Sequence, residues 1–272
     1  MIDSSDGRQL LAIAKQATAM AAELVRSGAP HTLTSKGDRD LTSDVDITVE
    51  QFVRNFLHQH TPHLGFFGEE CGGTHPTDGV RWVLDPIDGT INFLHGLPLC
   101  AVSLSLMRND MTLVGVIDMP FLGAQYYALS EHGSYANGQR LHVSATQTLN
   151  AALVSIDQYT FGVDAERANW ARHRLVEYLA SHAQRVRMLG ASAIDLAWTA
   201  HGRLDACIML GNKPWDTSAG VLIAREAGAR ILDLHGANHA TDSSATIAVS
   251  PSLEHELMTA VRAALANTAV SE

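Results

Sequence analysis

Acidic residues and a turn sequence that could bind a cation lie together in residues 85–90. Asp85 ends a short apolar run, and Asp88 follows three residues later. Pro86 interrupts strand pairing and fixes the chain direction, so a turn can aim both carboxylates at one point while Ile87 offers its backbone carbonyl. Carboxylates, a carbonyl and water form an all-oxygen environment, which favours Mg²⁺ or Mn²⁺ over Zn²⁺. The segment therefore predicts a metal centre.

Other residues that could bind a phosphate or a cation lie at the ends of apolar runs or at expected helix starts. Gly89 and Thr90 supply backbone N–H groups at an expected helix start, a suitable place for a phosphate. Glu69, Asp44 and Asp216 each follow an apolar run or begin a helix. A capping role explains any one of these acids alone. Together they indicate a metal site at the ends of several elements.

The composition limits the class of protein. The 272 residues, 46% of them hydrophobic, fit a soluble globular protein: one domain over residues 1–272, with tightly packed halves at about 1–150 and 151–272. Three cysteines in no zinc-like or disulfide-like spacing indicate free thiols in a reducing cytoplasm. The N-terminus does not read as a signal peptide, and no apolar run is long enough for a membrane span.

The net charge of −10, without a block of Lys or Arg, argues against nucleic acid as the main ligand. An acidic protein that acts on an anionic phosphate must make the electrostatic potential at its site positive. Divalent cations are the usual means.

The elements that position these residues follow from periodicity. Helices are expected at 7–27 and 44–58, with Asp44 at the N-cap of the second, and an exposed loop is expected at 34–40. Strands are expected at 64–67, 81–84, 101–107, 112–119 and 125–129. In the second half, strands at 152–156, 185–188, 206–210, 230–232 and 245–249 alternate with helices at 165–180, 191–201, 217–228 and 252–266. Meandering strands followed by helix–strand alternation indicate a mixed α/β architecture.

The ordered motifs resemble those of the inositol monophosphatase family, the magnesium-dependent and lithium-sensitive phosphatases. Residues 85–93 resemble its first signature, 215–220 its second, 67–70 its Gly-Glu-Glu element and 41–44 its Thr-x-x-Asp-like element, with Lys36 as the loop lysine that often precedes it. The elements occur in the expected order and cover most of the chain. The resemblance implies the layered αβαβα sandwich of the sugar phosphatases.

The resemblance also implies roles for individual residues. Glu69, Asp85 and the carbonyl of Ile87 would bind one Mg²⁺, and Asp85, Asp88 and Asp216 a second. Glu69 could help to hold a third. Asp44 and Thr90 would orient and deprotonate the attacking water. Lys36 is a further candidate, which would assist metal or phosphate binding from its loop. The substrate would contact the residues of a second group: Asp88, Gly89, Thr90, Ala191, Ser192, Met209 and Asp216.

The implied reaction is hydrolysis of a small inositol, sugar or amino-alcohol phosphate by direct attack of water. Met209 stands seven residues before Asp216, where inositol-hydrolysing members carry a hydroxyl-binding Glu; a thioether is a poor hydroxyl partner, which argues against inositol phosphate. Histidinol phosphate, fructose 1,6-bisphosphate and a 3′-phosphonucleotide are alternative substrates. A non-catalytic partner-binding role is a less favoured alternative. Relatives are often homodimers, which is the expected assembly here.

Overall fold

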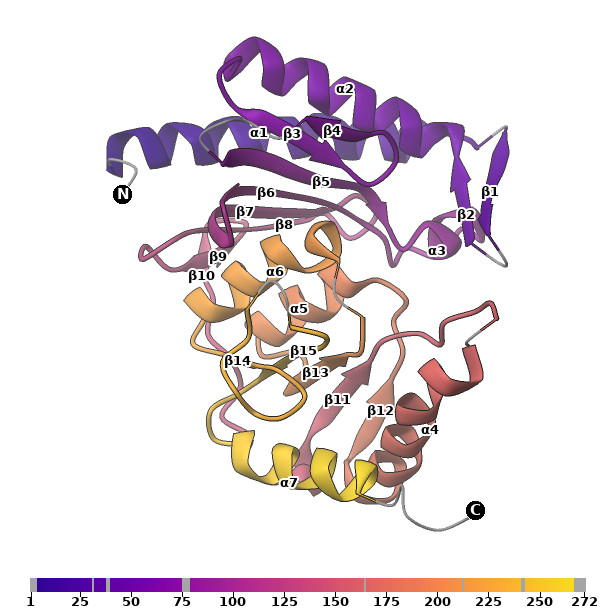
Figure 1. Ribbon diagram of the computed structural model, residues 1–272. Helices are drawn as coiled ribbons and strands as arrows, with labels where there is room; N and C mark the ends of the chain where they lie inside the picture. Colours follow the sequence, from indigo (N-terminus) through magenta and orange to yellow (C-terminus); the bar gives the residue numbers. More distant parts are fainter. Residues whose placement is uncertain are drawn as a thin grey trace.

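Five layers of alternating helices and sheets make up the computed structural model, which describes residues 4–30, 32–37, 40–74, 79–163, 165–211, 213–240 and 243–266. From top to bottom in Figure 1, the layers are α1 with α2, an eight-stranded sheet, α5 with α6, a five-stranded sheet, and α4 with α7. The predicted αβαβα sandwich is confirmed.

The first half builds the outer helices and the large sheet. Helices α1 (Ser4–Ser27) and α2 (Asp44–His60) cover a sheet of strand order β10-β9-β8-β7-β6-β5-β3-β4. In chain order its strands are β3 (Gly65–Gly68), β4 (Gly72–Thr74), β5 (Val80–Asp88), β6 (Ala101–Arg108), β7 (Met111–Met119), β8 (Ala124–Leu129), β9 (Ser134–Ala136) and β10 (Gln139–Arg140). The short helix α3 (Thr90–Leu94) follows β5 directly.

Two expectations for the segment before α2 were wrong. The described residues of the expected loop are strands: β1 (Leu33–Gly37) and β2 (Asp40–Ser43) pair as an antiparallel ribbon, in which Leu33 is opposite Ser43. Residues 38 and 39 lie outside the described residues. Backbone hydrogen bonds hold such an exposed ribbon, so its polar sequence carries no alternating apolar signal. The N-cap of α2 is Ser43 and not Asp44, because Ser43 and Asp46 form a reciprocal capping box.

The second half builds a smaller sheet of order β12-β11-β13-β15-β14, in which β12, β11 and β13 are parallel. After the 3₁₀ turn η1 (Leu149–Ala151), its elements are β11 (Leu153–Ile156), α4 (Ala165–His182), β12 (Arg185–Arg187), α5 (Ser192–Ala200), β13 (Ala206–Met209), α6 (Pro214–Glu226), β14 (Arg230–Leu232), β15 (Thr246–Val249) and α7 (Glu254–Leu265). The carboxyl ends of β11 and β13 lie side by side, which is a common position for a binding site.

The middle layer joins the halves. Helix α6 packs on both sheets, and its residues 217–224 are all buried, as expected for a helix with protein on every side. Gly115 of β7 permits a close approach of α6 to the large sheet, because a Cβ there would lie 2.7 Å from the carbonyl oxygen of Ala219. The site described next is built where this layer meets the large sheet. Within the described residues, no helix is long and apolar enough to cross a membrane.

Candidate metal centre

The parallel pair β3–β5 places Glu69 beside Asp85. Gly68 is paired with Leu84 in the ladder, and the Glu69 N–H donates to the Leu84 carbonyl at 3.1 Å. Glu69 and Asp85 are the next residues along two neighbouring parallel strands, so they reach the same edge of the sheet. The predicted proximity of these two acids therefore has a simple backbone cause.

Helix α6 brings the third acid from the second half of the chain. Asp216 lies in the first turn of α6, after Pro214, which suits a helix start. Trp215 anchors this turn on the large sheet: its ring lies 5.6 Å from that of Phe67, and its carbonyl accepts from the Ser103 hydroxyl at 3.3 Å.

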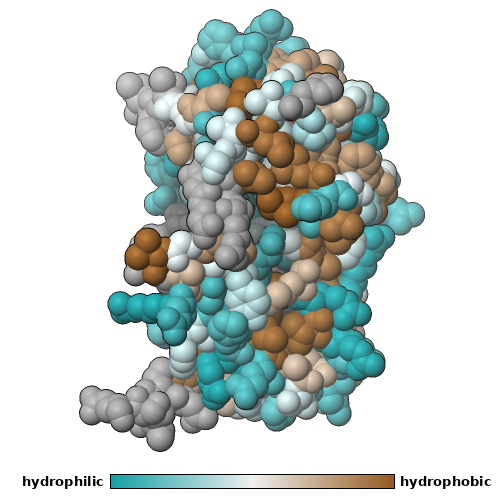
Figure 2. Space-filling model, turned by 90° about the vertical axis from the view of Figure 1, so that its right-hand side faces the viewer, coloured by the Kyte–Doolittle hydropathy of each residue, from teal (hydrophilic) through white to brown (hydrophobic). Residues whose placement is uncertain are grey.

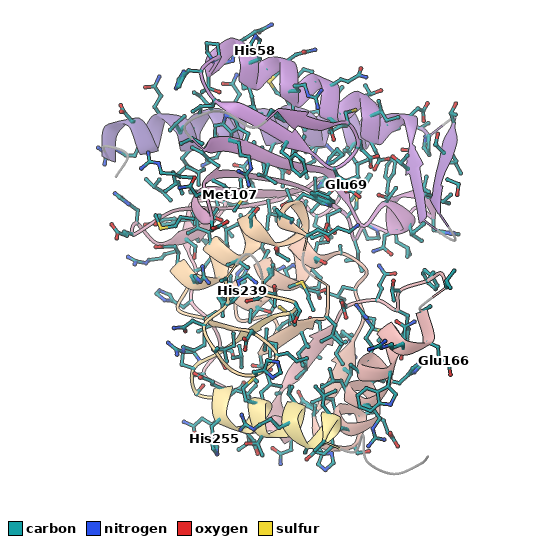
Figure 3. The ribbon with its side chains drawn as sticks, viewed as in Figure 1. His58, Glu69, Met107, Glu166, His239 and His255 are labelled. Atoms are coloured by element: carbon teal, nitrogen blue, oxygen red, sulfur yellow. The ribbon has the colours of Figure 1, made fainter. Side chains whose placement is uncertain are left out.

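Carboxylate oxygens of Glu69, Asp85 and Asp216 lie within 4.8 Å of one another. In Figure 3, Glu69 lies where the large sheet meets the layer of α5 and α6. Asp85 is 2% exposed. Burial raises its pKa well above the usual range, and the charges of Glu69, Asp88 and Asp216 raise it further. Such a cluster favours either a bound proton or a bound cation.

Asp88 lies in the same field but has a second connection. Burial and the charge of Asp216 raise its pKa well above the usual range. Its two oxygens accept the N–H groups of Ser192 at 3.2 Å and of Ala193 at 2.7 Å, at the start of α5. Each oxygen keeps a further lone pair for another partner. Asp88 therefore connects the predicted metal ligands with the start of α5, where substrate contacts are predicted.

Thr90 pairs with Asp46 and not with Asp44, the residue predicted to act with it. The Thr90 hydroxyl donates to Oδ1 of Asp46 at 3.2 Å and to the Ile87 carbonyl at 2.9 Å. Asp46 is 1% exposed, and burial raises its pKa. Oδ1 of Asp44 accepts from the backbone N–H of Thr32 at 3.3 Å, beside the β1–β2 ribbon.

The sequence contained a signal for Asp46. Ser43 followed by an acid three residues later is the pattern of a capping box, which moves the helix start by one residue. Asp46 also shares a helical face with the buried residues Val49, Val53 and Leu57, whereas Asp44 does not. A buried acid on the core side of a helix is a stronger functional candidate than an N-terminal one.

A cavity of about 390 Å³ adjoins the acids and contains most of the predicted substrate contacts. Six of them line it: Asp88, Gly89, Ala191, Ser192, Met209 and Asp216. Gly89 has φ +86°, and a Cβ there would lie 2.8 Å from the Leu99 carbonyl oxygen, so only glycine fits. The side chain of Lys36 lies outside the described part, so its role stays a prediction.

Sequence reasoning missed an ion pair in the cavity wall. Asp157, just after β11, receives two hydrogen bonds from Arg172 of α4, from Nε at 3.0 Å and from Nη2 at 2.6 Å, and one from the Leu210 N–H at 2.9 Å. Asp195 of α5 also lines the cavity, and its Oδ1 has no hydrogen-bond partner among the described residues. No local pattern marks contacts between residues so far apart in the chain.

Comparison with known proteins decides the family. Residues 6–266 match the sequence profile of the inositol monophosphatase family. The chain belongs to this family. It is therefore a phosphoric monoester hydrolase, as predicted.

The family assignment extends over most of the chain. Inositol monophosphatase 1 of Solanum lycopersicum is 32% identical over 264 residues, covering 93% of this chain and 95% of that protein. Inositol-1-monophosphatase ImpA of Mycolicibacterium smegmatis is 35% identical over 230 residues, covering 84% and 82%. The crystal structure of the extragenic suppressor protein suhB from Bartonella henselae superimposes with a TM-score of 0.88 at 27% identity, covering 96% of this chain and all of that one.

The residues of this family member fit a divalent cation. Glu69, Asp85 and Asp216 converge, and all three offer oxygen, the donor that Mg²⁺ prefers. Asp85 is fully buried, and the neighbouring charges that raise its pKa are those of other acids. Buried charges of one sign require a compensating partner. A cation at this place would supply it.

Proposed function

We propose that the protein is a Mg²⁺-dependent phosphatase that hydrolyses a small phosphate monoester by direct attack of water. One observation carries the proposal: acids from both halves of the chain converge beside a cavity of about 390 Å³. A cavity of this size suits a small metabolite. The number of bound ions is proposed as two or three, with Mn²⁺ as a substitute.

The metal ligands proposed are Glu69, Asp85, Asp88 and Asp216, with the carbonyl of Ile87. A cation held by them neutralises the acids and makes the phosphoryl group more electrophilic. Asp88 would also fix the position of the substrate, because it lines the cavity and is hydrogen-bonded to the amide of Ser192, which lines it too, and to that of Ala193. Phosphoryl transfer depends mainly on such positioning and on charge neutralisation.

Asp46 replaces Asp44 in the proposal for handling the proton of water. The single hydroxyl proton of Thr90 points to Asp46 and to the Ile87 carbonyl, which leaves the Thr90 oxygen able to accept a hydrogen bond from water. Asp46 is a buried carboxyl whose pKa burial raises, as suits a general base. Water would attack phosphorus while a proton passes through the Thr90 hydroxyl to Asp46. The bond between phosphorus and the ester oxygen would break, and the leaving oxygen would take a proton from solvent water and depart as the alcohol.

The cavity wall supports a leaving group other than inositol. Met209 lines the cavity with an apolar thioether, and the neighbouring Asp157 is engaged by Arg172. We propose a sugar, polyol or amino-alcohol phosphate with few hydroxyl groups on the side that faces Met209. The substrate would be a small metabolite, and neither nucleic acid nor a membrane is part of the proposal.

Phosphate release from a substrate panel tests the proposal. The panel comprises myo-inositol 1-phosphate, glycerol 3-phosphate, histidinol phosphate, fructose 1,6-bisphosphate and adenosine 3′,5′-bisphosphate, each with Mg²⁺ and with EDTA. We expect turnover only with Mg²⁺ and inhibition by millimolar Li⁺. A protein that releases no phosphate from the whole panel and binds no divalent ion would contradict the proposal and favour a partner-binding role.

We also propose that the protein acts as a homodimer in the cytoplasm. Exposed apolar side chains, including Leu33, Ile91, Leu97 and Phe121, belong to β1, α3 and the segments near them. Figure 2 shows apolar residues gathered on the upper part of the face that carries these elements. The three free thiols agree with a reducing compartment. Light scattering in solution tests the dimer.

A further inference from the structure

The turn that carries Glu69 is held by a second carboxylate, that of Glu50 on α2. Residues 69–71 connect β3 to β4, and Gly68 and Gly72 pair at the base of this turn. The N–H of Glu69 donates to β5. The N–H groups of Glu70 and Cys71 both donate to Glu50, to Oε2 at 2.8 Å and to Oε1 at 3.0 Å. The Glu50 carboxylate therefore accepts hydrogen bonds from two N–H groups of the turn, and the sheet accepts the third.

Glu50 is placed for this contact by close packing and by a paired charge. Its side chain is fully buried. Gly68 leaves the necessary space, since a Cβ there would lie 2.3 Å from the Glu50 carboxyl carbon. Arg54, one helical turn further along α2, lies 3.2 Å from Oε1 of Glu50 and donates to the Gly72 carbonyl at 2.8 Å. Glu50 and Arg54 together therefore bind the backbone of the turn at residues 70–72.

The same face of α2 serves both parts of the site. Asp46 and Glu50 are four residues apart, hence one above the other on the helix. Asp46 accepts from Thr90, and Glu50 accepts from the turn of Glu69. The capping box at Ser43 fixes the start of this helix. A rigid helix therefore sets the position of a proposed ligand relative to the residues that would handle water.

We propose that Glu50 is a positioning residue that sets the cation affinity of the centre by fixing the turn of Glu69. The inference rests on the proposed function, because it assumes that Glu69 is a metal ligand. Glu50 itself need not touch the cation or the substrate. Partners that orient metal ligands typically contribute 10- to 100-fold in affinity, and we expect an effect of that size here.

Mn²⁺ binding to substrate-free protein, measured by electron paramagnetic resonance and calorimetry, tests the inference. In Glu50→Gln one oxygen becomes an NH₂ group, which cannot accept from a backbone amide, so one N–H of the turn loses its acceptor. We expect the Kd for Mn²⁺ to rise about 10-fold or more, while kcat at saturating cation stays within about 3-fold of the wild type. A Kd unchanged from wild type would overturn the inference.

Two further variants separate geometry from charge and from general destabilisation. Glu50→Asp keeps the charge but withdraws the carboxylate, so we expect weakened Mn²⁺ binding; wild-type affinity in this variant would contradict a positioning role. Glu226 is the matched control: it also accepts two backbone amides, those of Glu131 at 2.7 Å and Gly133 at 2.6 Å, away from the cavity. Glu226→Gln should leave the Kd unchanged, and an equal rise there would mean a loss of stability alone.

The wild-type protein distinguishes the two levels of the argument. If it binds no Mn²⁺ and releases no phosphate, the proposed function fails. If it binds Mn²⁺ and Glu50→Gln binds it equally well, the proposed function stands and the role of Glu50 fails. Melting temperatures with EDTA for all variants verify that each one is folded before its Kd is compared.

Discussion

Thr90 and Asp46 are joined by a hydrogen bond of 3.2 Å, although 44 positions separate them in the sequence. The bond connects the first turn of α3 to the first turn of α2, at the edge of the sheet where Asp85 lies. Asp46 is also among the charges that raise the pKa of Asp85. The pair therefore belongs to the same electrostatic unit as the proposed metal ligands.

This pairing predicts different outcomes for two neighbouring acids. Asp46→Asn should lower kcat about 100-fold or more, because an amide cannot take a proton from water. Asp44→Asn should change kcat less than about 3-fold, since Asp44 accepts from the Thr32 amide at the β1–β2 ribbon. Phosphate release at saturating Mg²⁺ measures both. Equal losses in the two variants would mean that the assignment of Asp46 is wrong.

Asp85→Asn should abolish turnover and alter how the protein responds to cations. Asp85 is buried among acids that raise its pKa, so removing its charge should stabilise the metal-free fold by about 1 kcal/mol or more. Saturation at 100 times the Kd stabilises a protein by about 2.7 kcal/mol, and the variant should lose this gain. Thermal unfolding with EDTA and with Mg²⁺ measures both effects. Wild-type turnover in the variant would refute the site.

Asp195 predicts a pH dependence of stability. Burial raises its pKa to about 8, against about 4 in an unfolded chain. Between these values the folded protein holds a proton that the unfolded chain has lost, so the free energy of unfolding falls as pH rises, by at most about 1.4 kcal/mol per pH unit from this group.

Asp195→Asn removes this contribution. The free energy of unfolding of the variant, relative to that of the wild type, should increase steadily from pH 5 to pH 8. Urea unfolding of both metal-free proteins at four pH values measures it. Parallel profiles would show that Asp195 is ionised throughout the range.

Met209→Glu should shift substrate preference towards hydroxyl-rich leaving groups. Met209 lines the cavity and is 2% exposed. A carboxylate there offers a hydrogen bond worth about 1.5–3 kcal/mol to a substrate hydroxyl, so kcat/KM for myo-inositol 1-phosphate relative to glycerol 3-phosphate should rise about 10-fold or more. The buried polar group should lower stability by about 1–3 kcal/mol. Met209→Leu, of similar volume, is the control, and an equal ratio in both variants would exclude a role for position 209.

The residues at the centre of the site were predictable because their signal is local. Asp85 and Asp88 flank a Pro that ends strand pairing, and Glu69 follows an apolar strand. The sequence alone therefore places these acids at the carboxyl ends of strands. The order of the elements predicted the mixed α/β class, and the resemblance of the motifs to the family implied the layered sandwich.

The remaining residues depend on contacts that no short pattern records. Glu50 has the appearance of any acidic helix residue until β3 and β4 are placed against it. Asp157 and Arg172 meet only because α4 packs beside β11. The choice between Asp44 and Asp46 depended on locating the N-cap to within one residue, and this is the least certain part of a helix prediction.

The proposed ligands belong to different parts of the chain. Glu69 and Asp85 extend from the large sheet, Asp216 comes from α6, and Asp88 is hydrogen-bonded to α5. A cation bound at this centre would thus be a removable cross-link between the two halves of the molecule. Amide hydrogen exchange should be slowest where these halves meet when the ion is bound. A chelator should loosen the middle of the protein before its outer helices.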